Sequence, residues 1–392
     1  MKITDVKAIL LSSVVPPNQG MRSDAGKTLK WDAIIVRVET DEGITGHGPA
    51  LGTPLAVKDI VEGRLKPGLV GEDPTRIEYL WEKMYSGTRL SISLNKGYSV
   101  AAAGMNPSGE VMCAISGVDV ALWDIAGRAL GVPVYKLLGG LVRDRIPAYA
   151  SGGWALGEAA GDEVAGYVAT GYRAVKMHVG AQDGSFNDSM VRVRAMRRAA
   201  GADVDIMLDS HGSLTVAEAI KLAKAVEEYD IKWLEEPVSS SDRTGTAEVR
   251  AASSTPIAGG EREYSRYGIR ELIEARALDY LQPDVAVCGG ITEMRRICAM
   301  GAAYNLPVAP HNWSQAGIFA ANLQLAAATP NVPILEVCQA PHHELYWDIT
   351  SPRFRVEESW AYVPDGPGLG VEFDPEMERR FPYVPGPTQT QF

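Results

Sequence analysis

The stretch DIMLDSHGSLTVAEAIKLAKAVEEYDIKWLEEP, residues 205–237, contains two short apolar segments separated by an amphipathic one. The apolar segments, residues 205–211 and 231–237, predict buried strands. Residues 216–229 place apolar side chains at helical spacing and predict an amphipathic helix between the strands. Two buried strands joined by a helix are typical of a parallel βαβ unit.

The same alternation extends in both directions along the chain. Six further apolar segments predict strands at residues 146–151, 172–179, 256–261, 279–285, 307–313 and 333–338. Residues 292–304 have helical periodicity, and eight strands that alternate with helices predict a parallel β/α barrel. A doubly wound sheet would also alternate, but it usually carries a glycine-rich phosphate-binding turn, and the sequence has neither that pattern nor a P-loop.

The first part of the chain has a different pattern, in which strands precede helices. Residues 3–12 predict one strand, and residues 31–48 predict two more that a turn joins. Residues 73–85 and 111–130 predict helices, so this part predicts a small α+β unit. Residues 86–108 are rich in Gly, Ser and Asn and predict a loop.

Composition favours a soluble protein with one large domain and a smaller one. The 392 residues are 46% hydrophobic, which is enough for a large core. The formal net charge of -11 is spread along the chain without a basic block, which argues against nucleic acids and anionic membrane surfaces as partners. The chain has no apolar run as long as a membrane span, no secretory signal pattern, and four scattered cysteines. We therefore expect a cytoplasmic protein with reduced thiols.

Nearly every predicted barrel strand ends in an ionisable residue. These residues are Lys176, His178, Asp209, His211, Glu235, Glu236, Glu261, Asp284, His311 and Glu336. From Asp209 to Glu336 the strand ends lie 23 to 27 residues apart, which fits one strand, one helix and two loops each. The carboxyl ends of barrel strands open into one mouth, so we expect these side chains to converge there.

Three carboxylates on successive strands, Asp209, Glu235 and Glu261, would repel one another unless a cation lay among them. Oxygen ligands without cysteine or a compact histidine cluster select Mg²⁺, with Mn²⁺ as the alternative. The other interpretation is that one or more of them form salt bridges at helix N-termini.

The next two strands predict a general base. Asp284 and His311 end adjacent strands, where a carboxylate can hold one imidazole nitrogen and leave the other free to accept a proton. The chain has only six histidines, and three of them lie at these strand ends. This enrichment favours chemistry over a purely structural role.

Together these motifs resemble the enolase superfamily, and within it the mandelate racemase subgroup. The matching segments are KMH, LDSH, WLEEP, GGE, QPDVAVCGGIT and PHNW, on the second to seventh barrel strands. The resemblance covers nearly the whole chain and implies a (β/α)7β barrel in residues 126–364. It also implies an α+β capping domain in residues 1–125, to which residues 365–392 return. A symmetric homo-oligomer is a further implication of the resemblance.

The resemblance also implies roles for individual residues. Asp209, Glu235 and Glu261 match the ligands of Mg²⁺. The pair Asp284 and His311 matches the base that removes the proton α to a carboxylate. Glu336 matches the acid that hydrogen-bonds the substrate carboxylate. Glu236 follows a ligand in its motif and is not assigned to the site.

The chain departs from the racemase at two positions. His178 stands where the racemase has a second lysine, and His211 stands where it has an asparagine. The sequence Asp-Ser-His at residues 209–211 is similar to acid-sugar dehydratases of the galactonate type, in which this histidine protonates the departing hydroxide. We therefore expect a dehydratase of an aldonate or aldarate, with His311 as base and His211 or His178 as acid.

Lys176 is expected to neutralise the enediolate or the substrate carboxylate and to lower the pKa of His178 by like-charge repulsion. The alternatives are a racemase or epimerase, in which His178 and His311 act from opposite faces, and a sugar-lactone cycloisomerase. An inactive scaffold would lack a ligand residue, and no expected ligand is missing.

The substrate is expected to contact loops of the capping domain. Residues 14–31 and 46–54 are the predicted loops over the barrel mouth. Arg22 and Lys30 in the first of them, with Trp313 of the PHNW segment, are the predicted substrate-binding residues. The expected partner is a small acid sugar, and the sequence leaves mono-acids and di-acids equally open.

Overall fold

The computed structural model describes residues 1–102 and 107–390. Its N-terminal part is a three-stranded antiparallel sheet of β1 (Ile3–Val14), β4 (Lys30–Thr40) and β5 (Thr45–Ala50), in that order. The long helix α5 (Glu110–Leu130) packs on this sheet. Close packing requires glycine on β5, because a Cβ on Gly48 would lie 2.0 Å from the carbonyl oxygen of Gly117.

The rest of the N-terminal part is helical. Helix α1 (Pro54–Asp59) continues through a π-helical turn, Ile60–Leu65, into α2 (Lys66–Leu69), and α3 (Ile77–Ser86) follows. The prediction of a loop at residues 86–108 is wrong for Leu90–Lys96, which form α4, and residues 103–106 lie outside the described part. Helix α4 was missed because it is largely exposed and its sequence, LSISLNK, has no continuous apolar face.

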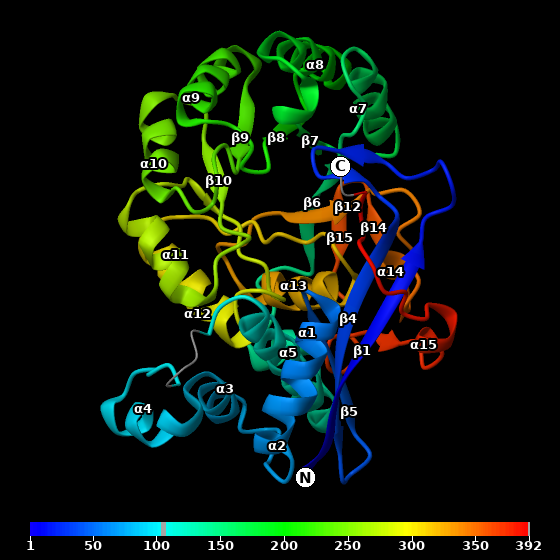
Figure 1. Cartoon of the computed structure of the whole chain (residues 1–392), viewed down its shortest axis with the longest axis vertical. Coiled ribbons are helices and arrows are strands. Elements are labelled where there is room, and N and C mark those ends of the chain that lie inside the picture. Colours follow the sequence, from blue (N-terminus) through cyan, green and yellow to red (C-terminus); the bar gives the residue numbers. More distant parts are fainter. Residues whose placement is uncertain (103–106, 391–392) are drawn as a thin grey trace.

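The barrel is built from parallel strands that surround a common axis (Figure 1). They are β6 (Arg145–Gly152), β7 (Ala174–His178), β8 (Asp205–Asp209), β9 (Ile231–Glu235), β10 (Ile257–Gly259), β11 (Tyr280–Leu281) and β12 (Leu335–Cys338). Strand β12 pairs with β6, from Leu335↔Ala148 to Cys338↔Ser151, and so brings the end of the barrel back to its beginning.

The predicted seventh strand, residues 307–313, is irregular. It joins the barrel through single bridges, Leu281↔Val308 and Asp284↔His311. Pro307 and Pro310 lack the N–H groups that a regular ladder requires, which accounts for the irregularity. The segment still places His311 at the mouth.

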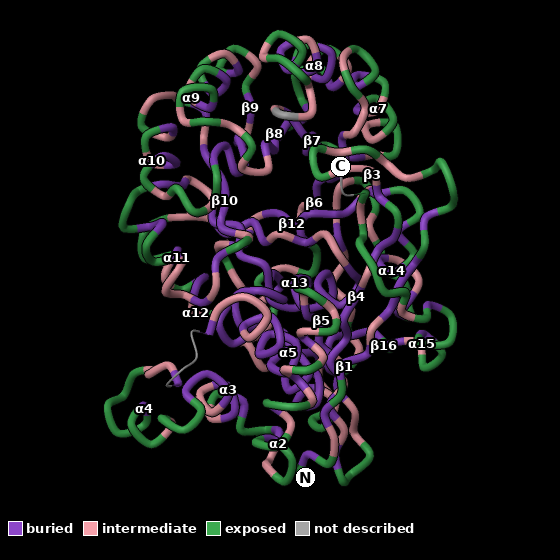
Figure 2. The backbone as a smooth tube through the Cα atoms, viewed as in Figure 1, coloured by how far each residue is buried: buried purple, intermediate pink, exposed green. Residues whose placement is uncertain are grey.

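The seven helices that follow the first seven strands surround the barrel (Figure 1). They are α7 (Ala159–Ala169), α8 (Phe186–Ala200), α9 (Val216–Ala225), α10 (Arg243–Ala252), α11 (Ser265–Glu274), α12 (Gly290–Ala303) and α13 (Ala316–Ala328). Figure 2 shows buried residues along the strands and along α5 and α13. The predicted (β/α)7β barrel with an N-terminal α+β unit is confirmed.

The C-terminal part returns to the N-terminal strands. After α6 (Val134–Leu137) and the barrel, the short elements are α14 (Glu344–Trp347), β13 (Thr350–Ser351), β14 (Val356–Glu357), β15 (Trp360–Tyr362), β16 (Glu372–Phe373) and α15 (Met377–Arg380). The backbone N–H of Ser12 donates to the carbonyl oxygen of Phe381 over 3.1 Å. The proposed division between residues 125 and 126 falls inside α5, which is continuous, so the domain limits stay a prediction.

A small hairpin extends from the N-terminal sheet toward the barrel mouth. It consists of β2 (Arg22–Ser23) and β3 (Gly26–Lys27), with a two-residue turn between them. None of the helices in residues 1–102 and 107–390 has the length and apolar composition needed to cross a membrane.

Candidate active site

A cavity of about 450 Å³ lies at the carboxyl ends of the barrel strands, beneath the β2–β3 hairpin. A volume of this size suits a small organic ligand. Its lining residues are Met21, Ser23, Asp24, Ala25, Trp31, Ser151, Trp154, Lys176, His178, Asp209, His211, Glu261, Arg262, His311, Trp313, Glu336 and Gln389. Most of the ionisable residues that were predicted to meet at the barrel mouth therefore line this one cavity.

Lys176 lies at the centre of a buried carboxylate cluster. Its Nζ is 2.5 Å from Oε1 of Glu235, 2.9 Å from Oε1 of Glu336 and 3.4 Å from Oδ2 of Asp209. Burial alone would lower the pKa of Lys176, but Glu235 and Glu336 together raise it well above its ordinary value. Lys176 is therefore a fixed positive charge beside the cavity.

The three predicted metal ligands end successive strands. Asp209 and Glu235 pair in register at the ends of β8 and β9, and Glu261 follows β10. Glu235 lies behind Lys176 and accepts hydrogen bonds from Trp233 Nε1 at 3.0 Å and Gln282 Nε2 at 2.7 Å. The carboxylates outnumber the lysine that contacts them, and this excess of buried negative charge suits a cation.

Among the described residues, potential metal-ligating atoms lie within 4.8 Å of one another in His178, Asp209 and His211. This group differs from the predicted ligands Asp209, Glu235 and Glu261. This set shares Asp209 with the predicted one. The side chain of Glu261 points instead toward His311, whose Nε2 is 3.5 Å from its Oε2.

Asp284 and His311 form a hydrogen-bonded pair. The distance from His311 Nδ1 to Asp284 Oδ2 is 2.6 Å, and the other carboxylate oxygen of Asp284 accepts from the N–H of Ala286 at 2.7 Å. Burial raises the pKa of Asp284. Burial would lower the pKa of His311, but Glu261 and Asp284 raise it well above its ordinary value. His311 thus presents Nε2 to the cavity while Asp284 holds Nδ1 from behind.

His178 and His211 lie side by side, with ring centroids 4.3 Å apart, but their environments differ. Burial, and then the neighbouring His211, lower the pKa of His178 to about 3. The expected lowering is present, but Lys176 is a lesser cause of it than burial. Asp209, and then Asp24, whose Oδ1 is 3.1 Å from His211 Nδ1, together raise the pKa of His211 to about 9.

Glu336 is buried within β12, as the second residue of that strand, and its Oε2 accepts a hydrogen bond from the N–H of Asn312 at 2.7 Å. Glu236, which was not assigned to the site, does not line the cavity and accepts from Arg262 Nε at 3.1 Å.

Two of the three predicted substrate-binding residues do not line the cavity. Trp313 does. Lys30 is buried elsewhere, with its Nζ 2.6 Å from Oδ2 of Asp32, and Arg22 is exposed on the outer side of the hairpin. Residues 46–54, the second predicted loop, also lie away from the mouth, because β5 packs on α5 instead.

The cavity also contains residues that the sequence did not single out: Trp154, Gln389, and Asp24 and Trp31 of the predicted loop at residues 14–31. Trp154 follows β6, so the rule that strand ends form the mouth would have found it if it had been applied to the first strand. No signal in the sequence marks Gln389, because only the folded chain brings the C-terminal tail to the barrel mouth.

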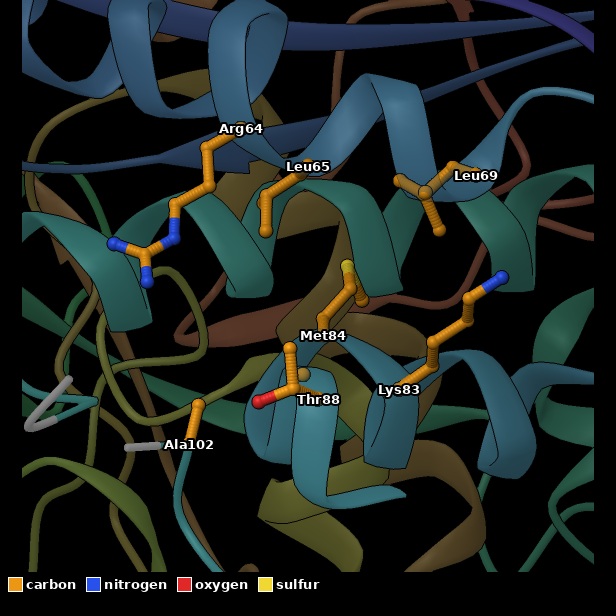
Figure 3. Close-up of a pocket in the computed structure, with 9 residues that line it drawn as sticks. Arg64, Leu65, Leu69, Lys83, Met84, Thr88 and Ala102 are labelled. Carbon is orange, nitrogen blue, oxygen red and sulfur yellow. The ribbon is translucent and has the colours of Figure 1, made fainter. Parts of the chain in front are cut away.

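A second cavity lies in the N-terminal part, between the π-helical turn and α3 (Figure 3). Leu65, Leu69 and Met84 give it an apolar floor, and Lys83 at its edge is 2.6 Å from Glu72. The described residues that line it include no histidine or carboxylate, so the barrel cavity is the candidate active site.

The comparisons with known proteins agree with this architecture. Residues 11–139 match the family described as mandelate racemase / muconate lactonizing enzyme, N-terminal domain, and residues 159–377 match the enolase C-terminal domain-like family. The chain belongs to the enolase superfamily, in its mandelate racemase/muconate lactonizing enzyme group.

Three relatives represent the range of activities. The chain is 32% identical to a D-galactarolactone cycloisomerase of Agrobacterium fabrum, over 97% of this chain and 99% of the relative. It is 35% identical to a D-galactonate dehydratase of Ralstonia pickettii, over 88% and 89%. A racemase from Streptomyces coelicolor A3(2) with bound magnesium has a similar structure, with a TM-score of 0.84, 29% identity, and 97% and 99% of the two chains covered.

Proposed function

We propose that the protein is an acid-sugar dehydratase, which removes the C2 proton of an aldonate or aldarate and eliminates the 3-hydroxyl to give a 2-keto-3-deoxy acid. The observation that carries this proposal is that one cavity is lined by the Lys176–Glu336 pair, by His211 and by His311, which Asp284 holds from behind. These supply a base, a charge for the substrate carboxylate and an acid. The dehydratase from Ralstonia pickettii supports the same reaction class.

We propose Asp209, Glu235 and Glu261 as ligands of Mg²⁺, with Mn²⁺ as the alternative. Asp209 and Glu235 belong to the excess of carboxylates around Lys176, and Glu261 follows the next strand with further oxygen atoms. Hard oxygen donors support this set over His178, Asp209 and His211, whose imidazoles suit softer metals. The magnesium-containing racemase supports the choice of ion. When bound, the ion supplies positive charge that stabilises the negative charge developing on the substrate carboxylate.

His311 Nε2 accepts the C2 proton in this mechanism, and Asp284 fixes the tautomer by accepting from Nδ1. The contribution of Glu261 to the raised pKa of His311 decreases when its charge is shared with a cation. Lys176 and Glu336 hold the substrate carboxylate as it becomes an enediolate. Lowering the barrier of such a weakly acidic C–H group requires roughly 10 kcal/mol of stabilisation or more.

We assign His211 as the general acid that protonates the departing 3-hydroxyl. It is the more exposed of the two histidines, and Asp24 and Asp209 flank its ring nitrogens at 3.1 and 3.5 Å. His178 is buried against Trp154 and is kept neutral, which suits a hydrogen bond to a substrate hydroxyl.

The experiment is a screen of acid sugars with Mg²⁺, in which 2-keto-3-deoxy acids are detected as semicarbazones. We expect product from at least one stereochemical series and none from His311→Asn. Absence of product from every acid sugar contradicts the proposal. Solvent deuterium at C2 without loss of water would instead indicate a racemase, and opening of a sugar lactone would indicate an activity like that of the Agrobacterium relative.

We further propose that the protein acts in the cytoplasm as a homo-oligomer. The four cysteines are buried and unpaired, which supports a reducing compartment. Cell fractionation tests the location, and light scattering after gel filtration tests the oligomeric state.

A further inference from the structure

The walls of the barrel cavity are aromatic. Trp31, Trp154 and Trp313 line it, with ring centroids 5.6 Å apart for Trp154 and Trp313 and 6.5 Å apart for Trp31 and Trp313. The indole N–H groups of Trp31 and Trp154 are shielded from solvent and have no hydrogen-bond partner among the described residues. They carry no charge, so the aromatic walls offer nothing that could neutralise a carboxylate.

The cations of the cavity already have partners. Among the described lining residues, the lysine is Lys176, the arginine is Arg262, and His211 and His311 each have a carboxylate at a ring nitrogen, Asp24 and Asp284. Lys176 contacts three carboxylates, and Arg262 Nε lies 3.1 Å from Glu236 and 3.6 Å from Glu261. Arg22 cannot compensate from the hairpin, because successive side chains of a strand alternate and its neighbours Met21 and Ser23 are the ones that face the cavity.

The hairpin adds a negative charge instead. Asp24 lies in its turn and lines the cavity. The C-terminal tail fixes this turn, since the N–H of Thr390 donates to the carbonyl of Lys27 at 2.9 Å and Lys27 N–H donates to Thr390 Oγ1 at 3.0 Å. Figure 2 shows β3 close to the C-terminus. Gln389 of the same tail completes the neutral part of the lining.

We propose that this cavity selects acid sugars with a single carboxylate and rejects the matched di-acids. The inference rests on the proposed function, in which Lys176 and Glu336 engage the first carboxylate. The remaining chain of a mono-acid presents only neutral hydroxyl groups, which can lie against aromatic walls without a charged partner. The second carboxylate of a di-acid would lose its water beside aromatic walls and Asp24, and the cations of the cavity are already paired with carboxylates.

The test uses pairs of substrates that differ only at the far end: galactonate and galactarate, gluconate and glucarate, mannonate and mannarate. We expect kcat/KM for the mono-acid of the active pair to exceed that for its di-acid by roughly tenfold or more. Asp24→Asn should raise the di-acid to mono-acid ratio of kcat/KM by roughly tenfold, since it removes one repelling charge. Gln389→Arg, which adds a cation, should raise the ratio too.

Asp162→Asn is the matched control, because Asp162 is exposed on α7 and does not line the cavity, so the ratio should not change. The ratio is the informative quantity, since any effect of Asp24 on His211 acts on both substrates alike. Equal turnover of mono-acids and di-acids overturns the inference and leaves the dehydratase proposal intact.

Binding gives a readout that does not depend on turnover. In His311→Asn the tryptophan fluorescence of the cavity reports ligand binding, and mono-acids should bind more tightly than the matched di-acids. Selective binding without any 2-keto-3-deoxy acid from the wild type would support the inference and contradict the proposed reaction. Equal binding of both classes would overturn the inference.

Discussion

Asp284→Asn tests the base assignment most directly, because Asp284 does not line the cavity and acts on the substrate only through His311. One of its oxygens accepts from the backbone N–H of Ala286, and an asparagine would keep its amide oxygen there. The amide N–H₂ would then face His311 Nδ1 as a donor. The imidazole proton would move to Nε2, the atom that should accept the C2 proton.

The expected loss is large because the substitution both inverts the tautomer and removes the carboxylate that stabilises the imidazolium. General-base catalysis contributes roughly 10² to 10⁴-fold, so we expect kcat/KM to fall by about 10³-fold, or ~4 kcal/mol. Folding should be nearly unaffected, because the side chains have the same shape and the bond to Ala286 is kept.

The assay measures both product formation and exchange of the C2 proton with solvent deuterium, together with thermal unfolding. Asp119→Asn is the matched control, because Asp119 is equally buried but lies away from the cavity. Its carboxylate accepts hydrogen bonds from the backbone N–H of Thr292 at 2.9 Å and from the Thr292 hydroxyl at 2.6 Å. We expect the control to keep its exchange rate. A folded Asp284→Asn enzyme that exchanges within tenfold of the wild type would refute the assignment of this pair as the base.

Three other perturbations should have separable effects. Lys176→Met leaves the buried carboxylates around it unpaired, so we expect the free energy of unfolding measured in urea to fall by roughly 3–5 kcal/mol and activity to be lost. Unchanged stability would contradict the role of Lys176 in the cluster. Glu261→Gln should weaken Mg²⁺ binding at least tenfold in titration calorimetry, and equal affinity would exclude Glu261 as a ligand. In the wild type, EDTA should abolish exchange of the C2 proton until Mg²⁺ is restored. Burial lowers the pKa of His343 to about 3 from an ordinary 6.5. The unfolded chain therefore protonates at His343 at a higher pH than the folded chain does. Folding stability is lost as pH falls from about 6.5 toward 3, by up to roughly 5 kcal/mol. His343→Phe should flatten this part of the pH–stability curve, and an unchanged slope would show that another group titrates there.

Local sequence patterns predicted most of the fold for a physical reason. A parallel strand buried on both faces must be apolar throughout, and a helix that covers it must be amphipathic, so each βαβ unit can be recognised in a short window. The prediction was less accurate where other rules apply. Prolines at 307 and 310 interrupt the seventh strand, and the exposed helix α4 has no buried face to create a pattern.

The strand-end rule located the chemistry of the barrel but not the contribution of the cap. Lys176, His311 and Glu336 reach one cavity because the barrel topology brings their strands side by side around one mouth. Asp24 and Gln389 reach the same cavity because a hairpin and a tail, far apart in sequence, pair with each other over the mouth. This pairing depends on tertiary packing, so residues of the predicted loop at 14–31, such as Lys30, could not be assigned correctly from their type alone.

The two neighbouring histidines show why the residue type does not determine the role. In sequence, His178 and His211 both end a barrel strand and both could donate a proton. The fold buries His178 behind Trp154 and keeps it neutral, whereas the cap brings Asp24 to the far nitrogen of His211. The hairpin turn that we expect to repel a second carboxylate therefore also orients the proposed acid. Substrate choice and proton donation depend on the same turn, so displacing it should impair both together.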